Sequence, residues 1–331
     1  MSFKKEIKRF LADGSDTIND DLILEVYKYQ YKYNTVYREY ANSLRKTPQI
    51  IQSIQEIPFL PISFFKNHRI QTLETGNAVE TAVIFYSSGT TSSNRSSHYV
   101  TDADFYKRRS QQLFEATYGD LSNYIILAVL PSYEENPSSS LIYMIDHFIK
   151  ATSHEASGFY SFSIPSIKKI LHELKKEKRK IIVWGVSYAL LDWAEEETDI
   201  YTDVIFMETG GMKGRRTELS RPELHARLKK GFSVSNIHSE YGMTELLSQA
   251  YSTGEGLYHF PIGFSAILRE TNDPFHQITQ GNGAMNLIDL ANMDSCCFIE
   301  TQDIGRIANQ SFEILGRMDA SDMRGCNLLY M

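Results

Sequence analysis

The chain has 331 residues, of which 42% are hydrophobic and 23% charged, and its formal net charge is -7. This composition is that of a folded globular protein, and the length suits one large domain with an appendage or two unequal lobes. The negative charge and the lack of a long basic run argue against sequence-independent nucleic-acid binding. The longest apolar stretches, such as residues 125–130, are far shorter than the roughly 20 residues of a membrane-spanning helix. We therefore expect neither a nucleic-acid partner nor a membrane span.

The cysteines and the amino terminus favour the cytoplasm. Cys296, Cys297 and Cys326 are too few and too clustered for a disulfide framework, and such thiols fit a reducing compartment. Residues 1–8 carry charge but are not followed by an apolar segment with a small-residue cleavage site, so no secretory signal is expected. Cys296 and Cys297 lie in an apolar run, which favours packing in the core.

The first 45 residues are predicted to be helical. Between residues 22 and 40 apolar and tyrosine side chains recur at spacings of three and four, which places them on one helix face. The tyrosines are interpreted as core residues rather than functional ones. Residues 57–66 combine prolines with aromatic residues, so they cannot form a helix interior and are predicted to be an extended connector.

A strand-then-helix alternation follows and indicates an α/β fold. The short, β-rich apolar runs are residues 82–85, 125–130, 181–184 and 204–207. Each is followed by a helical stretch, and the helix after residue 218 begins with a capping box from Ser220 to Glu223 and is expected to stop at Gly231. Such alternation predicts helices covering a largely parallel sheet, with ligands beyond the carboxyl ends of the strands. After about residue 255, glycines and shorter segments predict an antiparallel β region.

The segment that follows the strand at 82–85 is rich in hydroxyl groups. Residues 86–98 contain Ser87, Ser88, Gly89, Thr90 and Thr91, followed by further serines and Arg95. A loop of small residues lets backbone N–H groups approach phosphate oxygens, hydroxyls add hydrogen bonds, and an arginine supplies positive charge. The pattern is not a Walker loop, because Gly-Lys-Ser is absent. A solvated serine-rich turn is the alternative.

A second motif, residues 238–245, follows a predicted apolar strand at 232–237. Tyr241 can stack on a purine, Gly242 permits close backbone approach, and Thr244 with Glu245 can place a hydroxyl on a phosphate and a carboxylate on Mg²⁺. The alternative puts Tyr241 in the core and Glu245 at the start of a helix.

Two carboxylate-bearing turns are predicted further on. Asp303 precedes Gly305 and suits the diol of a ribose, although a turn-capping aspartate is the simpler interpretation. After Gly316, Arg317 and Asp319 flank a similar turn, and the alternative is an exposed ion pair of little energetic value.

In this order the segments resemble those of the adenylate-forming superfamily, which includes acyl-CoA synthetases, adenylation domains and firefly luciferase. Within it the likeness is strongest to the LuxE acyl-protein synthetases, because residues 58–66, 209–214 and 324–326 also match them. The likeness runs from about residue 25 to the C-terminus. It implies an adenylate-forming large-domain fold, with mixed, mostly parallel sheets covered by helices and a smaller antiparallel β region.

The resemblance also implies that ATP and Mg²⁺ are used to convert a carboxylic acid, for LuxE a fatty acid, into an acyl-adenylate. Thr244 would contact the α-phosphate, Glu245 would bind the metal, and Arg317 would belong to a hinge-like catalytic element. Cys326 would accept the acyl group and pass it to a partner reductase, and the alternative is a small buried side chain. The residues implied to bind the nucleotide are Ser87, Ser88, Gly89, Thr90, Thr91 and Arg95 for the phosphates, Gly210, Gly211, Tyr241 and Gly242 for adenine, and Asp303 for ribose.

The resemblance implies a division into an N-terminal helical segment, residues 1–55, a core domain, residues 56–315, and a tail, residues 316–331, that carries Cys326. Larger superfamily members have a mobile C-terminal domain with a catalytic lysine, and this domain is expected to be missing or vestigial because few residues follow Arg317. A basic cluster at Lys213, Arg215 and Arg216 is interpreted either as phosphate-facing or as a solvated face.

Two functional hypotheses follow. The first is a ligase that activates an acid and transfers it to a thiol, on Cys326, on an acyl carrier protein or on CoA. The second is a non-catalytic nucleotide- or acyl-binding subunit of a biosynthetic complex. Carboxylate-dependent exchange of pyrophosphate into ATP separates the two.

Overall fold

The chain folds into two compact units. The computed structural model describes residues 2–14, 18–74, 80–88, 95–132, 134–201, 203–210, 219–270, 273 and 276–318. Unit 1 comprises Met1–Ala103, Glu245–Ser248 and Phe260–Met331, and unit 2 comprises Asp104–Thr244 and Gln249–His259. The division at residues 55 and 315 stays a prediction.

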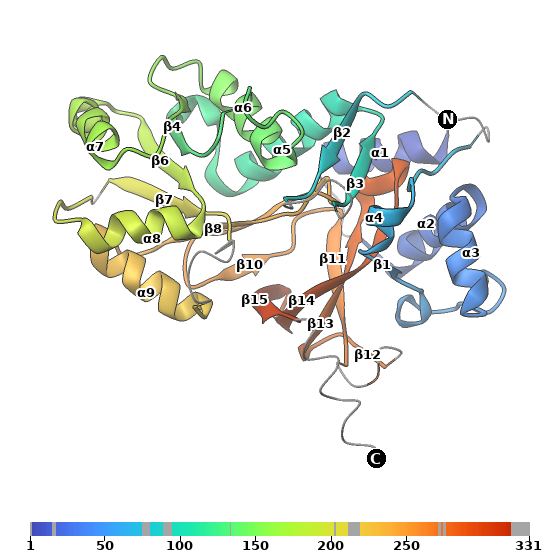
Figure 1. The fold of residues 1–331 in the computed structure, drawn as a ribbon. Coiled ribbons are helices and arrows are strands. Elements are labelled where there is room, and N and C mark those ends of the chain that lie inside the picture. Colours follow the sequence, from blue (N-terminus) through green and yellow to red (C-terminus); the bar gives the residue numbers. More distant parts are fainter. Residues whose placement is uncertain are drawn as a thin grey trace. The chain divides into compact units, whose positions relative to one another are not determined.

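Unit 2 is built around a mainly parallel sheet (Figure 1). Its strands run in the order β5-β4-β6-β7-β8-β9, and the pairing of β8 with β9 is antiparallel. Every residue of β4 is buried, as expected for a parallel strand covered on both faces. The strands of this unit are β4 (Tyr124–Val129), β5 (Gly158–Phe159), β6 (Lys180–Gly185), β7 (Val204–Glu208), β8 (His238–Tyr241), β9 (Ala250–Ser252) and β10 (Leu257–His259).

Helices cover both faces of this sheet. On one face Trp193 of α8 packs edge-on against Phe232 of α9, with ring centroids 5.2 Å apart. On the other, Phe114 of α5 and Phe148 of α6 pack against Trp184 of β6. The helical elements are α5 (Ala103–Tyr118), α6 (Ser140–Thr152), α7 (Ile164–Glu173), α8 (Ser187–Glu196) and α9 (Arg221–Phe232), with 3-10 turns η3 (Leu121–Asn123) and η4 (Leu174–Lys176).

The sequence places the strands of unit 2 well, with one error around residue 232. The predicted strand at 232–237 is wrong, because α9 continues through Gly231 to Phe232, whose side chain is buried in the core. The helix ends at Ser233, in the left-handed region at φ 55°, and β8 begins only at His238. The capping box at Ser220 and Glu223 is present as predicted.

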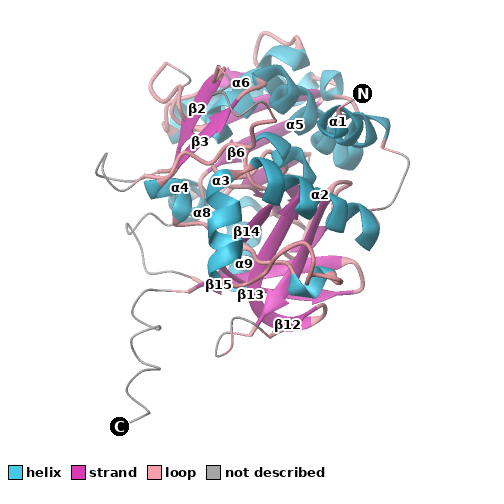
Figure 2. Cartoon of the chain, turned by 90° about the vertical axis from the view of Figure 1, so that its right-hand side faces the viewer, coloured by secondary structure: helices cyan, strands magenta, loops and turns pink. Residues whose placement is uncertain are grey.

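Unit 1 contains an antiparallel sheet, several strands of which are labelled in Figure 2. Its strands run in the order β15-β14-β13-β11-β12, and β1 pairs parallel to β14. The predicted antiparallel region is therefore confirmed, as is the α/β class. The strands are β1 (Leu60–Pro61), β2 (Val83–Tyr86), β3 (Ser97–Val100), β11 (Phe264–Arg269), β12 (Gln277–Ile278), β13 (Gly281–Asp289), β14 (Phe298–Ala308) and β15 (Ser311–Arg317). The helical elements are α1 (Phe3–Asp13), α2 (Asp20–Tyr33), α3 (Thr35–Ser43), α4 (Phe64–Asn67), η1 (Ile54–Glu56) and η5 (Leu290–Asp294).

Two local predictions in unit 1 are corrected. The strand near residues 82–85 is not followed by a helix, because β2 pairs with β3 in an antiparallel hairpin. The connector at 57–66 is extended only in part, since a short helix begins at Phe64.

Aromatic rings fill the core of unit 1. Tyr37 stacks on Phe298 with centroids 5.9 Å apart, and Phe59 meets the same ring edge-on. The predicted helical face is divided at Asn34, whose side chain caps α3. Cys296 and Cys297 are buried with free thiols, as predicted. Of the helices described, none combines the length and the apolar character that crossing a membrane requires.

Candidate functional site

The base of the hydroxyl-rich loop is closed by hydrogen bonds in unit 1. The Ser87 backbone N–H donates to the Ser96 carbonyl at 3.1 Å, and the Ser96 N–H donates to Ser87 Oγ at 2.8 Å. These bonds continue the β2–β3 ladder by one residue, so both ends of the loop are fixed. Ser88 is exposed, and Arg95 follows on the β3 side with a buried Nε that has no hydrogen-bond partner among the described residues. Gly89, Thr90 and Thr91 lie outside the described part of the chain.

Ser96 brings this loop to Glu245. The Ser96 hydroxyl hydrogen-bonds to the Glu245 carboxylate, which is 4% exposed. The strand after the loop is anchored beyond this point by His98, whose Nε2 lies 2.9 Å from Ser295 Oγ. Ser96 of the loop and Glu245, the last residue of the second motif, therefore meet in unit 1 although they are distant in sequence.

Asp303 and Arg317 lie on neighbouring strands beside the same carboxylate. They are register partners in the β14–β15 pair, which is joined through Asn309 and Gln310, both at positive φ (48° and 65°). Placing Asp303 in a turn was wrong, because it belongs to β14, whereas Arg317, which was expected beside a turn, is the last residue of β15. The Asp303 N–H donates to Thr301 Oγ1 at 3.1 Å, which fixes the backbone at the predicted ribose-binding position.

The electrostatics of Glu245 reflect this neighbourhood. Burial raises the pKa of its carboxyl group above the ordinary value, and the nearby Asp303 raises it further. The Ser96 hydrogen bond and the positive charge of Arg317 act in the opposite direction without cancelling the effect of burial. Because burial without enough compensation disfavours the charged form, this carboxylate has unused capacity to interact with a cation.

In unit 2 a buried glutamate holds the glycine turn that the resemblance assigns to adenine. Glu208, the last residue of β7, accepts a hydrogen bond from the Gly210 N–H at 2.7 Å. Gly210 has φ +72°, a conformation that favours glycine. Gly211 and the basic residues Lys213, Arg215 and Arg216 lie outside the described residues.

Residues 241–244 of the second motif follow β8. Tyr241 is 7% exposed, and its ring lies 5.9 Å from that of Tyr258, so the ring is mainly a core side chain. A Cβ at Gly242 would require the Glu240 carboxyl group to shift and would approach Gln249 Cγ to 3.3 Å. Thr244 is partly buried, at a turn rather than in a helix.

Sequence reasoning missed several residues of these two clusters. Ser96 could have been predicted from the sequence, because it is the last residue with a hydroxyl group before β3. Glu208 directly precedes the Thr-Gly-Gly turn, so a strand-end carboxylate was a usable signal. Glu240, next to Tyr241, is buried, and burial with the nearby charge of Glu208 raises its pKa to about 8. Cys326 lies outside the described residues.

The described residues contain no group of three or more His, Cys, Asp or Glu side chains that would hold a metal ion unaided. A single buried carboxylate is nevertheless what a Mg²⁺–nucleotide complex needs, since Mg²⁺ usually keeps waters and takes phosphate oxygens as ligands. Glu245, with its raised pKa, fits that role.

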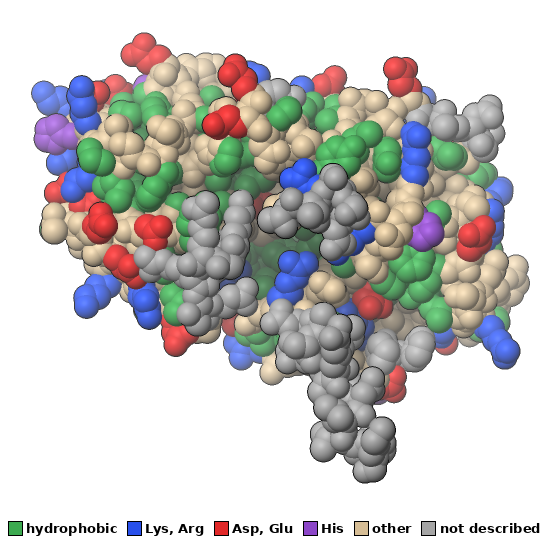
Figure 3. Space-filling view, in the orientation of Figure 1, with side chains coloured by type: hydrophobic (Ala, Val, Ile, Leu, Met, Phe, Trp, Pro, Cys, Tyr) green, Lys and Arg blue, Asp and Glu red, His purple; other side chains and the backbone are tan. Residues whose placement is uncertain are grey.

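A groove of about 1150 Å³ lies elsewhere in unit 2. It runs past the first residues of β6, β7 and β8, at the amino ends of the parallel strands, and none of the predicted site residues lines it. Figure 3 shows lysine and arginine side chains with a histidine over the neighbouring helix α7. Because parallel sheets bind ligands at the carboxyl ends of their strands, this groove is not the predicted site.

The fold of this chain is similar to those of several solved structures. 2-Hydroxyisobutyryl-CoA ligase, in complex with 2-HIB-AMP and CoA, has a TM-score of 0.62 and 12% identity, covering 97% of this chain and 70% of that chain. ATP-bound MatB from Rhodopseudomonas palustris has a TM-score of 0.51 and 14% identity, covering 74% and 50%. McyG A-PCP, complexed with phenylalanyl-adenylate, has a TM-score of 0.51 and 14% identity, covering 84% and 51%. At these identities the likeness shows the fold, and this chain spans about half the length of the last two structures.

A protein-family model also matches part of the chain. The model described as "Acyl-protein synthetase, LuxE" matches residues 8–109, less than half of the chain. The resemblance to LuxE and the adenylate-forming superfamily is confirmed. No curated protein matches the chain.

Proposed function

We propose that the protein binds ATP and activates a carboxylic acid as an acyl-adenylate. The observation that carries this proposal is the hydrogen bond between Ser96, at the end of the hydroxyl-rich loop, and the buried Glu245 carboxylate, with Asp303 and Arg317 beside it. A nucleotide needs phosphate donors, a metal-binding carboxylate and a partner for the ribose diol, and this cluster supplies all three kinds of group.

The loop residues are proposed to hold the phosphates. Arg95 supports this role, because its buried Nε has no partner among the described residues and a phosphate oxygen would satisfy it. Thr244 is proposed to contact the α-phosphate and Arg317 to offset negative charge during the reaction. The other residues proposed to bind phosphates are Ser87, Ser88, Gly89, Thr90 and Thr91.

Adenine and ribose are assigned to separate groups. Gly210 and Gly211 are proposed to bind adenine, and Glu208 accepts a hydrogen bond from the backbone N–H of the first of these glycines. Tyr241 with Gly242 is proposed to form the other side, and Asp303 is proposed to accept hydrogen bonds from the ribose hydroxyls.

Glu245 is proposed to hold Mg²⁺. When bound, the ion neutralises charge on the phosphate oxygens. The protein contributes a carboxylate that is buried and oriented by Ser96, so little reorganisation is needed on binding.

In the proposed reaction a carboxylate oxygen of the acid attacks the α-phosphorus of ATP. An O–P bond forms, and the bond from the α-phosphorus to the bridging oxygen breaks, so pyrophosphate leaves with the electron pair. Positioning and electrostatic stabilisation by the loop, Thr244 and Arg317 then account for most of the acceleration.

A second step is proposed in which a thiolate attacks the acyl carbon and AMP leaves. We assign the thiol to Cys326 in the tail, residues 316–331, with an acyl carrier protein or an acyl-accepting reductase as the next partner. The acid is proposed to be a fatty acid, as in LuxE. The location is proposed to be the cytoplasm, in keeping with the two free buried thiols.

Exchange of labelled pyrophosphate into ATP, with a panel of acids from short to long chain, tests the first step. Acid-dependent exchange is expected. ATP binding without exchange for any acid would instead support the nucleotide-binding subunit. Mass spectrometry after incubation with ATP and the active acid tests the second step: a thioester adduct is expected, and an adduct that survives Cys326→Ser would overturn the acceptor assignment.

A further inference from the structure

The segment 245–248 has no regular secondary structure and is held by a corner of unit 1. We call residues 289–295, which include η5, the η5 corner. Asp289, fully buried at the end of β13, accepts hydrogen bonds from the Leu247 N–H at 3.0 Å and the Ser248 N–H at 2.9 Å. It also accepts one from Ser248 Oγ at 2.7 Å.

Asn292 completes the attachment at Glu245 itself. Its Nδ2 donates to the Glu245 carbonyl at 2.7 Å and to the Cys296 carbonyl at 3.1 Å, while its Oδ1 accepts from the Leu247 N–H at 3.0 Å. Asn292 is fully buried, so these bonds are shielded from water. The backbone on which the Glu245 carboxylate is carried is therefore fixed by two side chains from the η5 corner.

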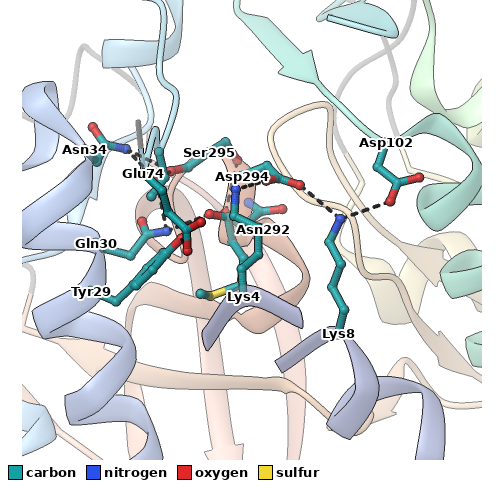
Figure 4. A network of polar contacts seen from close by, with 12 residues as sticks. Lys4, Lys8, Tyr29, Gln30, Asn34, Glu74, Asp102, Asn292, Asp294 and Ser295 are labelled. Atoms are coloured by element: carbon teal, nitrogen blue, oxygen red, sulfur yellow. Dashed lines mark hydrogen bonds and ion pairs between the residues drawn. The ribbon is translucent and has the colours of Figure 1, made fainter. Parts of the chain in front are cut away.

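The η5 corner is held in turn by the N-terminal helices (Figure 4). Gln30 of α2 donates to the Met293 carbonyl at 3.3 Å and accepts from the Cys297 N–H at 3.1 Å. Asp294 pairs with Lys4 and with Lys8, whose Nζ lies 3.1 Å from it. The corner is thus a rigid support between the N-terminal helices and the Glu245 segment.

We infer that Asp289 and Asn292 are positioning residues that orient the Glu245 carboxylate for the metal–nucleotide complex. The inference rests on the proposed function. A carboxylate on an irregular segment owes its direction to whatever holds the backbone, because no helix or strand ladder does so. Groups that orient a metal ligand typically contribute about 10-fold to 100-fold in metal affinity.

The test compares two isosteric changes on opposite sides of the η5 corner. Asn292→Leu removes the hydrogen bonds to Glu245 and Leu247, whereas Gln30→Met removes buried amide bonds to the same corner without touching the Glu245 segment. We measure the Mg²⁺ concentration that gives half of the ATP-dependent rise in melting temperature, and the same constant in pyrophosphate exchange. For Asn292→Leu both constants are expected to rise about 10-fold, and for Gln30→Met they are expected to stay at the wild-type value.

Equal Mg²⁺ constants for the two variants, at a similar loss of melting temperature, would show that Asn292 has only a structural role. If Asn292→Leu does not fold, Ser248→Ala replaces it, because it removes a single bond to Asp289 and is expected to give a smaller shift in the same direction. An unchanged constant in Ser248→Ala would then overturn the inference. Failure of the proposed function gives a different result: Glu245→Gln would bind ATP with the wild-type Mg²⁺ dependence.

Discussion

Two buried glutamates, one in each unit, have pKa values shifted in opposite directions. Glu208 of unit 2 is fully buried and accepts hydrogen bonds from Ser187 Oγ at 2.7 Å, from the Gly210 N–H at 2.7 Å and from Arg221 Nη1 at 2.5 Å. Its pKa is held well below the ordinary value, although burial alone would raise it. Glu245 of unit 1 is almost as buried, yet its pKa is raised.

The difference lies in what surrounds each carboxylate. Arg221 and the other donors satisfy the negative charge of Glu208, so this side chain needs nothing from a ligand and serves to hold the Gly210 turn. Glu245 accepts hydrogen bonds from the Ser96 hydroxyl and from its own backbone N–H, the positive charge of Arg317 attracts it, and Asp303 adds repulsion. Burial therefore does not by itself mark a functional carboxylate; an incomplete set of partners does.

The largest expected effect is a loss of pyrophosphate exchange when Glu245 is changed. Glu245→Gln is expected to lower pyrophosphate exchange by about 100-fold or more, because it removes a preorganised charge from the reacting centre. The melting temperature is expected to stay the same or rise, since a neutral amide is less costly to bury than an under-compensated carboxylate. Glu313→Gln, which removes a partly exposed pairing with Arg306, is the matched control for exchange. A large loss of stability in Glu245→Gln would contradict the contrast with Glu208.

The second largest expected effect is a loss of stability when Glu208 is changed. Glu208→Gln is expected to lower the free energy of unfolding by about 3 kcal/mol, because Arg221 would lose its buried counter-charge. Urea unfolding measures this, and Glu255→Gln, which alters an exposed pair with Lys229, serves as the control without a measurable change. A loss no greater than that of the control would mean that the Glu208 network contributes little.

The third expected effect is that the contributions of Glu240 and Glu208 to stability depend on pH in opposite directions. Glu240 has its pKa raised to about 8 in the folded protein, so it stabilises the fold fully below its ordinary value of 4.5 and loses this contribution as the pH rises through 8. Glu208, with a lowered pKa, stabilises the fold above pH 4.5 and loses this contribution as the pH falls below it. Unfolding measured from pH 5 to 8 is expected to show a Glu240 contribution that declines by up to about 1.4 kcal/mol per pH unit. Glu240→Gln should flatten this slope, and an unchanged slope would assign it to other groups.

The smallest expected effect concerns the charge next to Glu245. Arg317→Ala removes an attraction that lowers the pKa of Glu245, so the acid limb of the exchange–pH profile is expected to move to higher pH. Arg317→Lys keeps the charge and should leave the limb in place. If the acid limb of the profile moves equally in Arg317→Ala and Arg317→Lys, the shift is caused by the changed geometry of this side chain rather than by the loss of its charge.

Local patterns in the sequence were sufficient for much of the fold. The strands β4, β6 and β7 follow from continuous apolar runs, and the start of α9 follows from the Ser220–Glu223 capping box. The predicted strand at 232–237 was wrong because a short apolar run fits a helix end as well as a strand. Asp303 and Arg317 look like turn residues next to glycines, but pairing between β14 and β15 decides their structure.

The motifs of the candidate site could be predicted from the sequence, but the interactions that shift the pKa of Glu245 could not. The sequence identifies Glu245 as a carboxylate next to Thr244, and nothing in it indicates that Ser96 would be its partner. Likewise Asp289 lies 42 residues from Leu247, and only the folded chain brings the two together. Contacts of this kind depend on tertiary packing, which single-sequence periodicity does not encode.

The two-residue turn at Asn309 and Gln310, together with the register shift between Ile304 and Gly305, determines which side chains face each other at the far end of the β14–β15 hairpin. Exposed hairpin tips usually accept inserted residues without harm. Here an added residue would force either a new bulge or a slip, and a slip by one would turn Arg317 to the opposite face of the sheet. Loop-length variation at this exposed tip would thus act on the charge balance of Glu245, so the tip is a poor place to attach tags or fusion partners.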